Sequence, residues 1–362
     1  MTQDVRLAVD TAALAHNVAV LRRTAGDALV MVVVKANAYG HGAVESARAF
    51  AAAGVDWLGV ADLGEALELR RAGVTTPVLA WLHAPGETFD EAARHDVTPA
   101  VSDLAQLEAA AAAGVRAVHL CVDTGLSRNG AVESEWPALF DRAAELADVL
   151  PVEGLMSHLS NTSPEEDGLQ FAAFLRAAAA LGERGVEPPL RHLAASAAAL
   201  RFEGSHGSMV RFGLAAYGLS PYPDRRPADL GLRPAMTMTA PVTSIKRVPA
   251  GEGVSYGYLF RPERDTTIAV VPVGYSDGVD RAASDRASVT IGRRTYRVRG
   301  RIAMNALVID VGDDPVEVGD EVVLFGDPAL GRQGADDWAR ASGGITWDVV
   351  ASLSARLPRS WS

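Results

Sequence analysis

Lysine is nearly absent from this chain of 362 residues. Lysine and arginine together number 34, and lysine stands only at Lys35 and Lys246, so arginine supplies the other 34 − 2 = 32. Both side chains carry positive charge, but only the lysine amine readily loses its proton and becomes a nucleophile. The two lysines are therefore the first positions to examine for chemistry that arginine cannot perform.

Other scarce features exclude whole classes of function. Cys121 is the only cysteine, so we expect no internal disulfide and no metal site. No apolar run reaches the roughly 18–20 residues that span a bilayer, so we expect no membrane association. The formal net charge of −11 argues against nonspecific nucleic-acid binding. The segment Met1–Asp10 has no signal-peptide pattern, so we expect a cytoplasmic protein.

The first two thirds of the chain alternate short apolar runs with stretches of helical spacing. Repeated βα units predict an α/β fold, and eight of them predict a (β/α)8 barrel of the TIM type. A doubly wound sheet is the structural alternative. The eight runs are Ala28–Val34, Trp57–Val60, Val78–Trp81, Val97–Val101, Ala117–Val122, Gly154–Met156, His192–Ala194 and Met209–Phe212.

The pattern changes after a proline-rich linker between Pro221 and Pro234. The segments that follow are rich in β-branched residues and are joined by Gly/Asp turns. We therefore predict a barrel domain over residues 1–232 and a mostly β domain over residues 233–362. The predicted strands of the second domain are Val242–Val248, Thr267–Val273, Ala287–Ile291, Tyr296–Arg299, Ala306–Val311 and Glu321–Phe325.

Lys35 directly follows the continuous apolar run Ala28–Val34. Such a run is typical of a strand buried on both faces, and the C-terminal ends of barrel strands form the active-site face. A lysine in a desolvated pocket has a lowered pKa and can form a Schiff base. The alternative is a side chain that only extends to solvent. The small residues of Ala36–Gly42, with Tyr39 and His41 among them, suit close approach by a cofactor.

The run Val33–Gly42 resembles the cofactor-lysine motif of the bacterial alanine racemase family, and further matching blocks follow in the family's order along almost the whole chain. The resemblance implies a (β/α)8 barrel with a C-terminal β domain, pyridoxal 5′-phosphate (PLP) as cofactor, and a homodimer with shared active sites. It also implies interconversion of L- and D-alanine, which supplies D-alanine. Lys35 is then the Schiff-base lysine and one of two catalytic bases.

The opposite base is implied by the block Val254–Gly257, whose Tyr256 would come from the partner subunit. Racemisation removes a proton on one face of a planar carbanion and delivers one on the other, so two flanking groups are the direct solution. By the resemblance, His158 links this tyrosine to Arg211, and Arg211 contacts the pyridine nitrogen of PLP. Because arginine offers only donors, it would keep that nitrogen unprotonated.

The same resemblance implies the binding residues. Arg128 would contact the PLP phenolic oxygen and the substrate carboxylate, which suits its forked guanidinium. Met304 would face the partner's substrate, and Tyr275 would stand at the mouth of the site. The implied phosphate-binding residues are Tyr39, Ser196, Gly213 and Leu214.

Four positions depart from the family pattern. Cys121 stands where many relatives have a lysine that orients the residue matching Arg128. Asn305 replaces an aspartate, and Ala195 replaces an asparagine. Ala355 stands where a tyrosine is usual, which would remove a hydroxyl contact and open space.

These departures keep alternatives open. One is a racemase of the same mechanism that acts on a larger amino acid. Another is a PLP-binding homologue without turnover, against which the retained Lys35 and Tyr256 argue. A related family of PLP amino-acid decarboxylases uses a cysteine in its β domain, and Cys121 lies in the predicted barrel instead.

Overall fold

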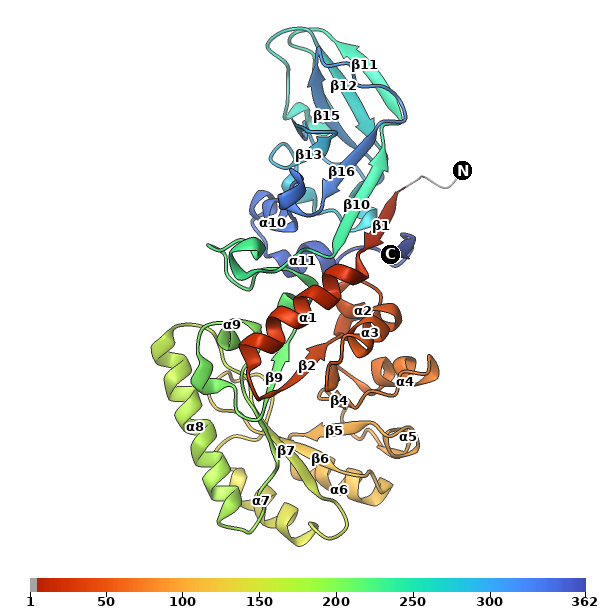
Figure 1. The fold of residues 1–362 in the computed structure, drawn as a ribbon. Coiled ribbons are helices and arrows are strands. Elements are labelled where there is room, and N and C mark those ends of the chain that lie inside the picture. The colour runs from red at the N-terminus through yellow and green to blue at the C-terminus, as the bar shows by residue number, and fades with distance from the viewer. Residues whose placement is uncertain (1–4) are drawn as a thin grey trace. The chain divides into compact units, whose positions relative to one another are not determined.

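The computed structural model describes residues 5–362, and they form two compact units that interleave along the sequence (Figure 1). One unit comprises Ala15–Ala38 and Ala43–Ala216. The other combines the described residues up to Leu14 with Tyr39–Gly42 and Tyr217–Ser362. We keep residues 232/233 as the predicted boundary in the sequence. Within the described residues, no helix is both long and apolar enough to cross a membrane.

The first unit is the predicted (β/α)8 barrel, with eight parallel strands in the order β8-β7-β6-β5-β4-β3-β2-β9. The Ala195↔Arg211 bridge joins the two end strands and closes the barrel. The strands are β2 (Leu29–Val33), β3 (Trp57–Val60), β4 (Val78–Ala80), β5 (Thr98–Val101), β6 (Val118–Cys121), β7 (Val152–Met156), β8 (Leu190–His192) and β9 (Met209–Phe212).

Helices follow the strands around the outside of this barrel (Figure 1). Two of them begin at side-chain caps: Asp103 accepts from Gln106 N, and Ser163 accepts from Glu166 N. The helices are α1 (Thr11–Ala25, which starts in the other unit), α3 (Ala43–Ala52), α4 (Leu63–Arg71), α5 (Asp90–Arg94), α6 (Leu104–Ala113), α7 (Trp136–Glu145), α8 (Pro164–Gly182) and α9 (Ser196–Ala199).

The barrel interior is a packed layer to which every strand contributes one side chain. Because side chains alternate along a strand, Trp81, two residues after Leu79, and Lys35, four residues after Met31, face the same side as this layer. The layer consists of Met31, Trp57, Leu79, Ala100, Cys121, Met156, Leu190 and Met209. The eighth predicted run, Met209–Phe212, coincides with β9. The seventh predicted run, His192–Ala194, lies two residues too late, because β8 spans Leu190–His192.

The second unit is mostly β, as predicted, and contains two sheets. The first has the order β14-β13-β16-β10-β1-β17 and the second β11-β12-β15. The strands are β1 (Arg6–Val9), β10 (Met236–Pro241), β11 (Ser244–Val248), β12 (Thr266–Val271), β13 (Ser288–Ile291), β14 (Arg294–Arg297), β15 (Leu307–Gly312), β16 (Glu321–Phe325) and β17 (Arg359–Trp361). Its helices are α10 (Ala335–Ser342) and α11 (Thr346–Ala351).

The sequence patterns missed the two ends of the chain. Strand β1 pairs antiparallel with β10 and parallel with β17, so the N-terminal and C-terminal segments lie side by side in one sheet. Strand β17 has only three residues and contains Arg359, Ser360 and Trp361, which do not form an apolar run. A short strand that pairs with a distant segment need not show a local hydrophobic periodicity, so the sequence pattern does not reveal it.

Candidate active site

Lys35 lies at the C-terminal end of β2, on the side of the strand that faces the barrel interior. Its Nζ atom is 5.9 Å from the centre of the Trp81 ring. Burial lowers the pKa of the Lys35 amine, and the positive charges of Arg128 and Arg211 lower it further, while Glu65 opposes them. The neutral amine is therefore more accessible here than at a lysine in water, which is what a nucleophile or a base requires.

The four residues after Lys35 form one turn of left-handed helix. Ala36, Asn37, Ala38 and Tyr39 have φ values of 52°, 54°, 53° and 51°. Each L-residue in this conformation costs about 1–2 kcal/mol, so the turn stores roughly 4–8 kcal/mol that its surroundings must offset. Strain of this size is typical of functional sites.

Side chains of the barrel unit hold the start of this turn. Glu65 accepts from Ala36 N at 2.6 Å with one carboxylate oxygen and from Ala61 N at 2.8 Å with the other. Asn37 Oδ1 accepts from Ala43 N at 2.8 Å. The direction in which the chain leaves β2 after Lys35 is thereby fixed by a carboxylate and an amide.

Arg211 is a buried cation on β9 whose bonds go to neutral groups. Its Nη1 donates to His192 O at 2.8 Å, and its Nη2 donates to Ser157 O at 2.6 Å and Leu193 O at 3.2 Å. Burial lowers the Arg211 pKa to about 10. None of its hydrogen bonds to residues 5–362 involves Nε, so this N–H is free to donate to a ligand.

The bond between Arg211 and His158 determines the tautomer of the imidazole. Arg211 Nη2 lies 3.1 Å from His158 Nδ1. Since a guanidinium can only donate, Nδ1 must accept, and the proton of the neutral ring resides on Nε2. Burial, followed by Arg211, Arg128 and Lys35, lowers the pKa of His158 to about 3, so the ring is neutral near pH 7. The predicted link from Arg211 to His158 is present, and it leaves an N–H for a further acceptor.

A second histidine chain runs beneath Arg211 inside the barrel. Arg211 Nη1 lies 3.0 Å from His192 Nδ1, and His192 Nε2 lies 2.8 Å from His119 Nδ1. By the same donor argument, each ring is neutral with its proton on Nε2. Gly154 makes room for the His119 ring, because a Cβ atom there would lie 2.5 Å from it. Neither ring is among the predicted site residues, although strand alternation from the inward-facing Cys121 and Leu190 places both rings inward.

Ser196 and Gly213, predicted to bind a phosphate, are neighbours in the barrel unit. Ser196 begins α9, and its Oγ accepts from Gly213 N at 3.0 Å. Leu214 follows at the start of the 3-10 turn η2 (Leu214–Tyr217). Tyr39 belongs to the other unit, so its part in phosphate binding remains a prediction.

The charged side chains near Lys35, at the C-terminal ends of the barrel strands, suit PLP. Arg128 and Arg211 lower the pKa of Lys35, Arg128 also lowers the pKa of Arg211, and the Glu65 carboxylate raises the pKa of Lys35. A cluster of cations with an unused Arg211 Nε–H is an environment for an anionic ligand with an acceptor nitrogen. The residues present therefore fit the cofactor.

The surroundings of Arg128 bear on the predicted departure at Cys121. Arg128 is exposed and makes no hydrogen bond to residues 5–362. Cys121 is buried, burial raises its thiol pKa to about 11, and it is hydrogen-bonded to Ser102. Ser102 in turn donates to Asn129 Oδ1 at 3.3 Å. The neutral thiol is thus connected to the residue after Arg128 and not to the guanidinium itself.

Three predicted residues of the other unit are connected by one loop. Ser255, beside Tyr256, donates to Arg301 O at 2.6 Å. Tyr275 N donates to Ala303 O at 3.1 Å, next to Met304. Tyr256, Tyr275 and Met304 are 69%, 43% and 54% exposed, so each presents a large apolar surface that this chain leaves uncovered.

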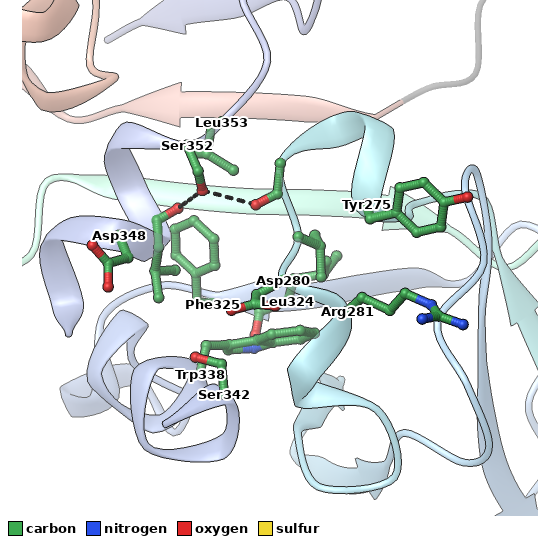
Figure 2. A pocket seen from close by; sticks show the side chains of 13 residues that line it. Tyr275, Asp280, Arg281, Leu324, Phe325, Trp338, Ser342, Asp348, Ser352 and Leu353 are labelled. Carbon is green, nitrogen blue, oxygen red and sulfur yellow. Dashed lines mark hydrogen bonds between the residues drawn. The ribbon is translucent and has the colours of Figure 1, made fainter. Parts of the chain in front are cut away.

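Tyr275 also borders a cavity of about 370 Å³ in the same unit. Figure 2 shows apolar side chains of Phe325 and Trp338 in this cavity, while the Tyr275 ring and the Arg281 guanidinium point together away from them. Ser352 closes one side by donating to Gly278 O at 2.8 Å. This cavity shares only Tyr275 with the predicted site residues.

Two residues near Lys35 were not predicted. Trp81 ends the predicted strand Val78–Trp81, and Glu65 lies outside the predicted site. The spacing of Leu79 and Trp81 by two residues was the available signal, because it places both on one face of the strand. No sequence pattern pointed from Glu65 to Ala36, since the contact joins a helix to a distant turn.

Comparison with known proteins gives the family. Residues 9–221 match the model of the alanine racemase N-terminal domain, and residues 235–361 match that of the C-terminal domain. An alanine racemase of Frankia casuarinae is 47% identical, with 98% of this chain and 95% of that protein covered. One of Mycolicibacterium vanbaalenii is also 47% identical, with 100% and 96% covered.

A solved structure agrees over the full length. The alanine racemase from D-cycloserine-producing Streptomyces lavendulae has a TM-score of 0.96 and 41% identity, with 100% of this chain and 98% of that chain covered. The two-part architecture is thus that of a family of isomerases. The chain belongs to the alanine racemase family.

Proposed function

We propose that this protein interconverts L- and D-alanine with PLP as cofactor, by a two-base mechanism. The observation that carries the proposal is the half-buried amine of Lys35, whose pKa is lowered by burial and by Arg128 and Arg211, in a chain whose whole length matches alanine racemases. When bound, PLP supplies an electron sink that acidifies the Cα proton of the attached amino acid.

The residues of the chain divide the proton movements between two faces. Lys35 would hold the cofactor through its amine, and its Nζ would take or return the Cα proton on one face. Its lowered pKa keeps a basic form available near neutral pH. Tyr256 of a second subunit acts from the opposite face through its phenolic oxygen.

The neighbouring residues hold charge and orientation. The Nε2–H of His158 is directed by the Arg211–His158 bond and is available to the Tyr256 oxygen of the partner. Arg211, whose hydrogen bonds to residues 5–362 leave Nε–H unused, would hold the pyridine nitrogen of the cofactor and keep it unprotonated. Arg128 is free to bind the substrate carboxylate, and Ser196, Gly213, Leu214 and Tyr39 are proposed to hold the phosphate.

The test compares the two lysines of the chain. Lys35→Ala should abolish racemisation of alanine, measured by chiral chromatography, and borohydride reduction should no longer fix PLP to the protein. Lys246→Ala is the matched control, because Lys246 is exposed on β11 and should leave both unchanged. Cofactor still fixed to the Lys35→Ala protein would refute the assignment.

We also propose a homodimer with shared sites, supported by the exposure of Tyr256, Tyr275 and Met304. Lys35→Ala and Tyr256→Phe chains, each inactive alone, are coexpressed. If Tyr256 acts in the partner's site, each mixed dimer regains one complete site, so about a quarter of the parental activity returns. If it acted within its own chain, mixing would restore nothing.

A larger substrate remains the alternative to alanine. Ala355 is exposed, Asn305 Nδ2 donates to Ser276 Oγ at 2.7 Å, and Cys121 is buried, so the three departures do not share one contact. Racemisation across a panel of amino acids decides between the two. Fastest turnover of alanine supports the proposal, and Ala355→Tyr should then change the panel little.

A further inference from the structure

The C-terminal strand β17 presents two side chains to the segment that follows the Lys35 turn. It runs parallel to β1, with Arg359 opposite Leu7 and Trp361 opposite Val9. Because side chains alternate along a strand, Arg359 and Trp361 point to one side and Ser360 points to the other. Ser360 is exposed, whereas Arg359 and Trp361 are half-buried.

These two side chains bond consecutive carbonyls of one backbone segment. Arg359 Nε donates to Gly40 O at 2.7 Å, and Trp361 Nε1 donates to His41 O at 3.1 Å. All these residues belong to the same compact unit. A side chain that bonds a main-chain carbonyl fixes the orientation of that peptide, so the pair restrains two successive peptides.

The packing around the segment leaves no room for a side chain at Gly40 or Gly42. Gly42 has φ +94°, and a Cβ atom there would lie 2.5 Å from the Trp361 ring. Gly40 has φ +81°, and a Cβ atom there would lie 2.1 Å from Val350 O in α11. The backbone therefore lies directly against the indole and against the helix, which only glycine permits.

Arg359 does little else than bind carbonyls. Its Nη1 donates to Leu357 O at 3.1 Å and reaches Ser354 O at 3.5 Å, and Nη2 is buried without a hydrogen bond to residues 5–362. Burial lowers its pKa, and within the described residues it forms no salt bridge. A surface arginine kept for charge would instead stay solvated or pair with a carboxylate.

We propose that Arg359 and Trp361 are positioning residues for Lys35. By holding Gly40–Gly42, they hold the end of the left-handed turn 36–39, and through it the direction in which Lys35 leaves β2. This inference rests on the proposed function, since it gives Lys35 its role. Strand β17 would thereby contribute to attachment of the cofactor at Lys35.

The experiment uses Trp361→Ala and Arg359→Met, with Ser360→Ala as the control on the opposite face of the strand. Hydrogen exchange of the amides of residues 36–43 is measured in the protein freed of cofactor, together with the dissociation constant of PLP. We expect exchange to accelerate at least tenfold and PLP binding to weaken at least fivefold. The amides of residues 209–212 and the Ser360→Ala protein should match the parent.

Conservative variants cover the case in which the first pair does not fold. Trp361→Phe keeps a ring against Gly42 but loses the bond to His41 O, and Arg359→Lys keeps the charge but not the Nε geometry. Both should fall between the parent and the larger changes. Exchange and PLP affinity within twofold of the parent in all folded variants would overturn the inference.

The outcomes separate this inference from the proposed function. Cofactor that remains fixed in Lys35→Ala overturns the proposed function whatever the exchange data show. A parent that fixes PLP at Lys35 and racemises alanine, while Trp361→Ala and Arg359→Met behave as the parent does, overturns only the positioning role.

Discussion

The buried imidazole of His119 should make the protein sensitive to mild acid. His119 is fully buried, and burial, followed by the charge of Arg211, lowers its pKa from 6.5 to about 3. Glu153 Oε2 is 3.9 Å from His119 Nε2, too far for a hydrogen bond, and burial raises the pKa of this carboxyl. The folded protein therefore offers an incoming proton on His119 little stabilisation.

The direction of the change in stability with pH follows from the uptake of a proton when the protein unfolds. Between pH 6.5 and about 3 the unfolded chain binds a proton at His119 and the folded chain does not, so stability falls as the pH falls through this window. The loss is about 1.4 kcal/mol per pH unit, or about 2 kcal/mol at pH 5 relative to pH 7.5. His192 is shifted in the same direction by burial. Against a typical total of roughly 5–15 kcal/mol, one such residue is a large fraction.

The assay compares the parent with His119→Gln. Glutamine keeps an acceptor for His192 but does not titrate, so the variant should lose about 2 kcal/mol less than the parent between pH 7.5 and pH 5. Guanidinium denaturation at both pH values, at one protein concentration, gives the four free energies. His95→Gln removes a histidine whose side chain is 40% exposed and is the control. An equal loss in the parent and in His119→Gln would refute the reasoning.

Two further substitutions test the strain and packing near Lys35. Ala36→Gly should raise the free energy of unfolding by about 0.5–1 kcal/mol, because relief of the left-handed conformation of an alanine exceeds the cost of the added entropy of the unfolded chain. Thermal unfolding measures this change. A destabilised variant would contradict the idea that the turn is strained at Ala36. Gly59→Ala should lower stability by about 1–3 kcal/mol, because its Cβ atom would lie 2.7 Å from the Trp81 ring and 3.0 Å from Met31 Sδ. A changed tryptophan fluorescence should accompany that loss, and an unchanged spectrum would show that Trp81 is not displaced.

The barrel was predictable from sequence because its signals are local. Each strand is a short apolar run, and the residue type of an N-cap such as Asp103 or Ser163 indicates where a helix begins. The site residues Lys35, Arg211 and His158 were placed by motif. Their mutual arrangement in the barrel mouth then follows from strand order, which brings C-terminal strand ends together.

What could not be predicted depends on contacts between distant segments. The pairing of β1 with β17 joins the two ends of the chain, and neither strand has a periodicity that names its partner. The tautomers of His158 and His192 follow from a single donor, Arg211, that reaches both rings. The left-handed turn contains ordinary residues, Ala36 to Tyr39, so its handedness is imposed by surroundings and not by glycine.

That turn has a stereochemical consequence. At Ala36 the backbone angles are φ 52° and ψ 51°, and at Ala38 they are 53° and 50°. A D-residue with these angles is the mirror image of an L-residue with ordinary right-handed helical angles. D-Alanine would fit both positions without strain, whereas the ribosome can supply only the L-form. In a semisynthetic chain, the mirror-image amino acid that we propose as the product would relax the backbone beside the lysine that makes it.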